Sequence, residues 1–128
     1  MVKSIKKTTT VLMLALVLML AMAVPAFANP YNDYNYYFEY DGAYHAHSSS
    51  YIAANATVSG GNVTITLSGN YFPEVEVGGV TYSGVYDSGT NTTKLTFPGS
   101  SSAPIDLSLH VVVAPWHNTW YPLTLVWG

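Results

Sequence analysis

The sequence contains no cysteine among its 128 residues and only four lysines and arginines. Without cysteine, no disulfide supports the fold and no lipid-modified cysteine can anchor the chain. Three of the four cations lie at the extreme N-terminus, at Lys3, Lys6 and Lys7, and Lys94 is the only other one. A domain with one cation cannot neutralise a phosphate backbone or an anionic membrane surface, so nucleic acid and anionic lipid are poor candidates as partners.

The chain also has no apolar run long enough to span a bilayer, which takes about 20 residues. The run from Val11 to Val24 is shorter, follows the three lysines and is followed by small residues at Ala26 and Ala28. This order predicts a secretory signal peptide at 1–28, removed after Ala28, and no stable membrane insertion afterwards. We expect a product that is extracellular or at the cell envelope. Loss of the three lysines changes the formal net charge from −3 to −6.

The remaining residues, 29–128, predict a single all-β domain. Apolar residues alternate with polar ones, which is typical of half-buried strands, and glycine-rich turns keep the segments short. The predicted strands lie at 33–40, 52–58, 62–68, 74–82, 93–97, 105–113 and 121–127. We therefore predict an immunoglobulin-like antiparallel β-sandwich of seven to eight strands.

Motifs for covalent or phosphoryl-transfer chemistry are missing. The chain contains no nucleophile elbow, no P-loop and no Cys/His dyad, and Glu74 and Glu76 lie on one predicted strand without a paired acid. We predict that the protein is not an enzyme.

Two segments contain residues suited to ligand binding. The C-terminal segment "APWHNTWYPLTLVWG" sets His117 between Trp116 and Trp120, with Tyr121 four residues after the histidine. Residues i and i+4 of a strand share a face, so Tyr121 lies on the side of His117 if the strand begins by residue 117.

The second segment, "AYHAHSSSYI", has histidines at 45 and 47 and a serine run that favours a loop with one helical turn over 48–51, leading into the strand at 52–58. The two histidines suit a solvated loop, or a zinc or copper site completed by His110 or His117. His110 itself lies on the polar face of its predicted strand, where we expect it to be solvated.

Taken together, "SSSYI", "NTTKLTF" and "APIDLSLHVVVAPWHNTWYPLTLVW" resemble the NEAT domain, a family of secreted or surface-displayed haem-binding modules of Gram-positive bacteria. Tyr51 stands where the family has a tyrosine closing a short 3₁₀ segment before the second strand. Tyr121 stands at the second tyrosine of the family's Y-x-x-x-Y motif. His117 replaces the first tyrosine, the usual iron ligand, and histidine is also an established haem ligand.

The resemblance implies a secreted haemophore that binds haem b (iron protoporphyrin IX) and exchanges it with haemoproteins or other NEAT-type carriers. His117 would be the iron ligand and Tyr121 its hydrogen-bond partner, with His47, or His45 in its place, as a second ligand. A neutral histidine ligand would retain haem on reduction. The implied pocket consists of Ser48, Ser50, Tyr51, Ile52, Val111, Val113, Trp116, Trp120 and Leu123.

A different function also fits the sequence. An immunoglobulin-like sandwich with an aromatic tip at Trp116 and Trp120 suits adhesion to protein or glycan without haem, and the tyrosine-rich stretch at 31–44 suits it equally.

Overall fold

Residues 32–128 are described by a computed structural model, and they fold almost entirely into β-strands. The predicted signal peptide, and residues 29–31 of the predicted mature chain, lie outside the described residues. The compact unit Asn32–Gly128 contains eleven strands and one short helix. In chain order these are β1 (Asp33–Tyr34), β2 (Tyr36–Tyr40), β3 (Ala43–Tyr44), α2 (Ala46–Ser49), β4 (Ile52–Ser59), β5 (Asn62–Ser68), β6 (Glu74–Val77), β7 (Val80–Ser83), β8 (Val85–Asp87), β9 (Thr92–Pro98), β10 (Ile105–Val113) and β11 (His117–Trp127).

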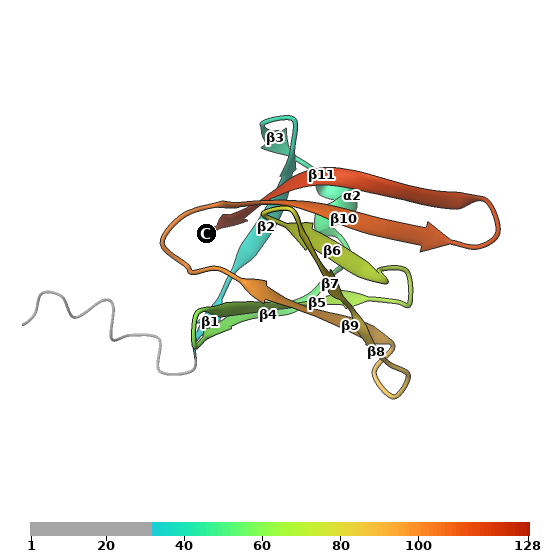
Figure 1. The fold of residues 1–128 in the computed structure, drawn as a ribbon, viewed down its shortest axis with the longest axis horizontal. Helices are drawn as coiled ribbons and strands as arrows, with labels where there is room; N and C mark the ends of the chain where they lie inside the picture. Colours follow the sequence, from blue (N-terminus) through green and yellow to red (C-terminus); the bar gives the residue numbers. More distant parts are fainter. Residues whose placement is uncertain (1–31) are drawn as a thin grey trace, which may run out of the picture. The chain divides into compact units, whose positions relative to one another are not determined.

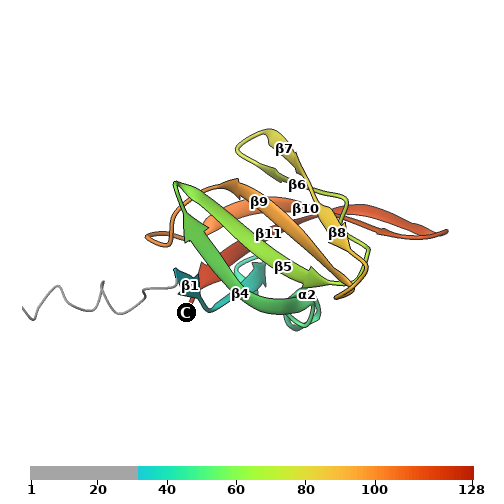
Figure 2. The same cartoon turned by 90° about the horizontal axis from the view of Figure 1, so that it is seen from below.

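The strands form two antiparallel sheets (Figures 1 and 2). One sheet has five strands in the order β1-β4-β5-β9-β8, and the other has six in the order β3-β2-β11-β10-β6-β7. The predicted all-β sandwich is therefore confirmed. The strand number exceeds the predicted seven or eight for three reasons: the stretch 33–40 divides at Asn35, the stretch 74–82 divides into β6 and β7, and β3 and β8 have only two and three residues. Strands that short contain too little alternation to be recognised in a sequence.

Alternating apolar residues fill the space between the sheets. In β5, Val63, Ile65 and Leu67 are fully buried, whereas Thr64 and Thr66 are only half-buried. The same alternation buries side chains of the other strands, including Phe38, Val75, Leu95, Phe97, Leu109, Leu123 and Leu125. Removing each such side chain from water stabilises the fold by about 1.5–3 kcal/mol.

The helix α2 stands in place of the predicted 3₁₀ segment, directly before β4, which is the second of the strands predicted from the sequence. The Ser49 and Ser50 N–H groups donate to the carbonyls of His45 and Ala46, at 3.1 and 2.9 Å, which is α-helical spacing. Only the last bond, from the Tyr51 N–H to the Ser48 carbonyl, has 3₁₀ spacing. Within residues 32–128 no helix is long and apolar enough to cross a membrane.

Strands β10 and β11 form a hairpin whose tip extends beyond its neighbours (Figure 1). Val113 pairs with His117, so the turn consists of residues 114–116. Strand β6 pairs with β10 only at 108–110, and β2 pairs with β11 only at 124–127. The tip thus projects without a neighbouring strand in its sheet, and it can form one wall of a groove.

Candidate functional site

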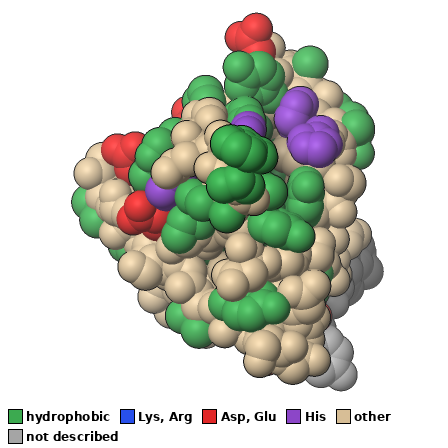
Figure 3. All heavy atoms as spheres, turned by 90° about the vertical axis from the view of Figure 1, so that its right-hand side faces the viewer, with side chains coloured by type: hydrophobic (Ala, Val, Ile, Leu, Met, Phe, Trp, Pro, Cys, Tyr) green, Lys and Arg blue, Asp and Glu red, His purple; other side chains and the backbone are tan. Residues whose placement is uncertain are grey.

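A groove of about 550 Å³ lies between the β10–β11 hairpin and the segment that contains α2. Its walls combine aliphatic and aromatic side chains with three histidines. The lining contains no aspartate, glutamate, lysine or arginine. The lining residues are His45, His47, Ser48, Tyr51, Phe72, Leu109, Val111, Val113, His117, Tyr121 and Leu123. Figure 3, seen from the side of the hairpin tip, shows histidines among hydrophobic side chains and no lysine or arginine on this face.

The hairpin forms one wall through alternate residues of its two strands. Successive side chains of a strand point to opposite faces, so Leu109, Val111 and Val113 of β10 face the groove together. Leu109 is paired with Tyr121 and Val113 with His117, which brings the two ends of this wall into register.

His117 and Tyr121 are in direct contact on that wall. The Tyr121 hydroxyl lies 2.8 Å from His117 Nε2, and the two rings stack with centroids 5.8 Å apart and planes 15° apart. Strand β11 begins at His117, which meets the condition for the two side chains to share a face. Their roles toward a ligand remain a prediction.

The opposite wall is held in place by the α2 segment. His45 caps the helix, because its Nδ1 accepts a hydrogen bond from the Ser48 N–H at 3.2 Å and lies 2.7 Å from the Ser48 hydroxyl. Ser49 connects the helix to β2, since its hydroxyl accepts from the Phe38 N–H at 3.0 Å. The His45 N–H also donates to the Phe38 carbonyl, at 2.9 Å.

His47 is the exposed imidazole of this wall. Its ring packs edge-on against Tyr51, with centroids 5.6 Å apart, and neither ring nitrogen has a hydrogen-bond partner among residues 32–128. Tyr51 in turn packs edge-on against Phe72, which is nearly fully buried. His47 therefore has both nitrogens available, whereas His45 uses its Nδ1 within the helix cap.

Four residues of the predicted pocket lie outside the groove lining. Ser50 points its hydroxyl at the His47 carbonyl, 2.6 Å away, and Ile52 packs against the core at the start of β4. Trp116 is in the hairpin turn and 91% exposed. Trp120 stacks on His110, on the opposite face of the hairpin from His117 and Tyr121.

The sequence reading missed two lining residues, Phe72 and Leu109. The alternation that placed Val111 and Val113 in the groove extends to Leu109, so Leu109 could have been predicted from the sequence. Phe72 lies outside any strand, between β5 and β6, and no local pattern marks it.

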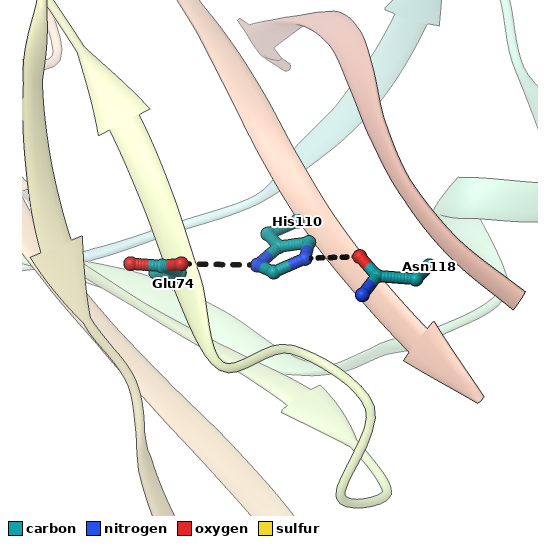
Figure 4. Close-up of polar contacts among 3 residues, drawn as sticks. All are labelled: Glu74, His110 and Asn118. Atoms are coloured by element: carbon teal, nitrogen blue, oxygen red, sulfur yellow. Dashed lines mark hydrogen bonds and ion pairs between the residues drawn. The ribbon is translucent and has the colours of Figure 1, made fainter. Parts of the chain in front are cut away.

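His110 forms a polar cluster on the outer face of the hairpin (Figure 4). Its Nδ1 lies 3.1 Å from Glu74 Oε2 and its Nε2 lies 2.7 Å from Asn118 Oδ1. The ring also stacks on Trp120, with centroids 4.5 Å apart and planes 6° apart. The expectation that His110 is merely solvated is wrong, because its side chain is only 14% exposed and is hydrogen-bonded at both nitrogens.

A bare zinc or copper site does not form around these histidines. No group of three or more histidines, cysteines, aspartates or glutamates in the described part of the chain is arranged to hold a metal ion. His110 could not complete a site with His45 and His47, since it lies on the other face of the hairpin.

The groove residues fit a haem. The volume of the groove lies within the roughly 300–1,000 Å³ of ligand pockets, and the walls of the groove are apolar. Imidazole and phenol are established iron ligands. The donor set is thus suited to a metal that brings its own four equatorial ligands. Lys94, the only described lysine or arginine, lies on β9 of the other sheet.

No family model matches this chain, and no curated protein matches it in sequence. The likeness to the NEAT family stays a prediction from the residues quoted above.

Proposed function

We propose that this protein binds haem b in the groove and passes it on, as a carrier that does no bond chemistry of its own. One observation supports this most directly: the groove has an imidazole–phenol pair on one wall, and on the other an imidazole that has no hydrogen-bond partner among residues 32–128. The pair is His117 with Tyr121, and the free imidazole is His47. A flat apolar disc with a central metal needs apolar walls and ligands of these kinds.

In this proposal each wall has its own task. The aliphatic side chains of Leu109, Val111 and Val113 contact the macrocycle and exclude water from it. The hairpin pair would hold the iron, and His47 is the second candidate ligand. Bound haem supplies the iron that is carried.

The propionates of such a haem would find no cation in the groove. They would face solvent or take hydroxyl and backbone N–H donors such as those near Ser48. Binding would therefore depend on apolar contact and ligation, and the hand-over partners would be haemoproteins or NEAT-type carriers outside the cell.

A groove-blocking variant tests the proposal. Protein purified from haem-containing cells should be coloured and show a Soret absorbance band. Val113→Asp, which puts a carboxylate in the groove, should remove the colour because burying an unpaired charge against haem is costly. Val85→Asp is the matched control, since Val85 is 69% exposed and lies outside the groove. Colourless wild-type protein, or colour retained in Val113→Asp, would contradict the proposal.

One observation favours the second candidate, adhesion to protein or glycan. Trp116 is 91% exposed at the hairpin tip, and tryptophan is enriched at protein interfaces and among their hot-spot residues. The haem proposal expects Trp116→Ala to leave the Soret band unchanged. Under the adhesion proposal, wild-type protein would be colourless and Trp116→Ala would lose binding in a glycan-array assay.

A further inference from the structure

The hydrogen bond between Tyr121 and His117 indicates which of the two side chains can bind iron. We propose that the Tyr121 oxygen, rather than a nitrogen of His117, is the iron ligand of this wall, and that His117 is its positioning residue. The inference rests on the proposed haem function and reverses the roles that the sequence suggests for the two residues.

The lone pairs of the two side chains favour Tyr121 as the ligand. A neutral imidazole has one nitrogen that donates and one that accepts, whereas a hydroxyl oxygen has two lone pairs. Nε2, the ring nitrogen farther from the backbone, is already engaged by the Tyr121 hydroxyl at 2.8 Å. If Nε2 accepts, Nδ1 bears the proton and no imidazole pair is free. If Nε2 donates, only Nδ1 is free, and an iron there would have to approach beside the β11 backbone. In both cases the Tyr121 oxygen keeps a free pair.

The fold also holds Tyr121 in place more firmly than His117. Tyr121 is half-buried and packs against the hydrophobic core, whereas His117 is exposed beside the turn. Tyr121 also lies opposite Leu109, which is almost fully buried. A ligand must be held in one orientation by its surroundings, and Tyr121 is the better held of the two. The stacked His117 ring then fixes the direction of the hydroxyl.

The proton balance follows from the same contact. A phenol that ligates iron does so as a phenolate, so its O–H bond breaks. With Nε2 as the acceptor of the Tyr121 hydroxyl, the proton would move to His117 Nε2, where an N–H bond would form, and this N–H would donate back to the phenolate oxygen. The pair as a whole keeps its charge, and no outside base is needed. Because an anionic oxygen prefers the ferric ion, reduction should weaken binding, the opposite of the result for a histidine ligand.

The test compares Tyr121→Phe with His117→Ala, using ferric haem and, as a control for packing alone, metal-free protoporphyrin IX. Tyr121→Phe should lose at least about 100-fold in haem affinity and the phenolate-to-iron charge-transfer band, with porphyrin binding unchanged. His117→Ala should keep that band, shifted, and lose about 10- to 100-fold, as is typical when a residue behind a ligand is removed. His117→Gln, which can still hydrogen-bond the hydroxyl, should recover part of this loss.

Ligand-free protein gives an independent readout. Nitrogen chemical shifts of His117 should show an Nε2 engaged by a hydroxyl, and Tyr121→Phe should change them while thermal unfolding stays cooperative.

Each outcome separates this inference from the haem proposal. A Tyr121→Phe protein with the wild-type haem spectrum, together with loss of binding in His117→Ala, would overturn the inference and leave haem binding intact. A wild-type protein that binds neither ferric haem nor metal-free porphyrin would overturn both.

Discussion

Tyr36 is the single residue whose chemistry burial changes most. Its side chain is 7% exposed, and its hydroxyl has no hydrogen-bond partner among the described residues. The rings of Phe38 and Trp127 pack edge-on against it. Desolvation by these surroundings disfavours the phenolate and raises the pKa of Tyr36 well above its ordinary value.

This raised pKa predicts a loss of stability in alkali. The folded protein keeps the Tyr36 proton above about pH 10, where the unfolded chain releases it. The contribution of Tyr36 to the free energy of unfolding is therefore intact below about pH 10 and falls as the pH rises above it. Tyr36→Phe should flatten that fall. At pH 7 it should add about 1 kcal/mol, because it removes a buried hydroxyl that has no partner.

Urea unfolding at pH 7 and pH 11 measures both effects. Tyr44→Phe is the control, since Tyr44 is 63% exposed. Equal losses between the two pH values in wild type and Tyr36→Phe would show that Tyr36 is not the titrating group.

Among the elements, α2 depends on its attachment to β2. The Ser49 hydroxyl lies against both the N–H and the carbonyl of Phe38, at 3.0 and 3.4 Å. The neighbouring Ser50 hydroxyl contacts only the His47 carbonyl, within its own turn. The contact of Ser49 with Phe38 therefore fixes the position of His47 relative to the hairpin.

Ser49→Ala should therefore loosen this wall of the groove. We expect a loss of about 1 kcal/mol in the free energy of unfolding, and a roughly 5-fold weaker haem affinity because the same contact positions His47. Ser50→Ala is the matched control and should change neither value appreciably. Chemical denaturation and haem titration of the two variants measure these effects, and equal behaviour would contradict the assigned role of Ser49.

Gly84 lets the chain pass from one sheet to the other. It separates β7, which pairs with β6, from β8, which pairs with β9. A Cβ atom at this position would lie 2.6 Å from the Phe72 carbonyl oxygen and 2.8 Å from Thr93 Cγ2. The Gly84 N–H also donates to the Pro73 carbonyl, at 2.8 Å. The passage therefore has no room for a side chain.

Gly84→Ala should destabilise the fold by about 1–3 kcal/mol, the usual cost of overpacking. Gly89→Ala is the control, since there an added Cβ approaches only the Asp87 side chain, at 3.2 Å. Thermal unfolding of both variants decides the matter. A Gly84→Ala melting temperature equal to that of Gly89→Ala would contradict the close packing at the sheet crossing.

At the scale of the whole molecule, the sequence predicted most of the fold. The bounds of β10 and of β5 coincide with the stretches read from alternation, because a half-buried strand records its own burial in its sequence. The contact of His117 with Tyr121 was conditional on where the hairpin turns. Side chains of a strand alternate between its two faces. Trp120, three residues after His117, therefore lies on the face opposite to His117.

Features that depend on distant partners were not predictable. His110 contacts Glu74, which is 36 residues away in the sequence. Asp106 and Ser108 share its strand face and are polar, so the sequence indicated only a solvated face. The helical turn α2 depends on the Ser49–Phe38 contact, which joins residues 11 apart. Such contacts depend on the order of strands in the sheets, and no local sequence pattern predicts that order.

The central claim, that the groove binds haem, is tested most directly by titrating residues 29–128, which contain the whole described core, with ferric haem. Absorbance near the Soret band should rise and saturate at one haem per chain, and Val113→Asp should abolish the saturation while Val85→Asp should not. An absorbance that grows without saturation in the wild-type protein, as for free haem, would contradict the account.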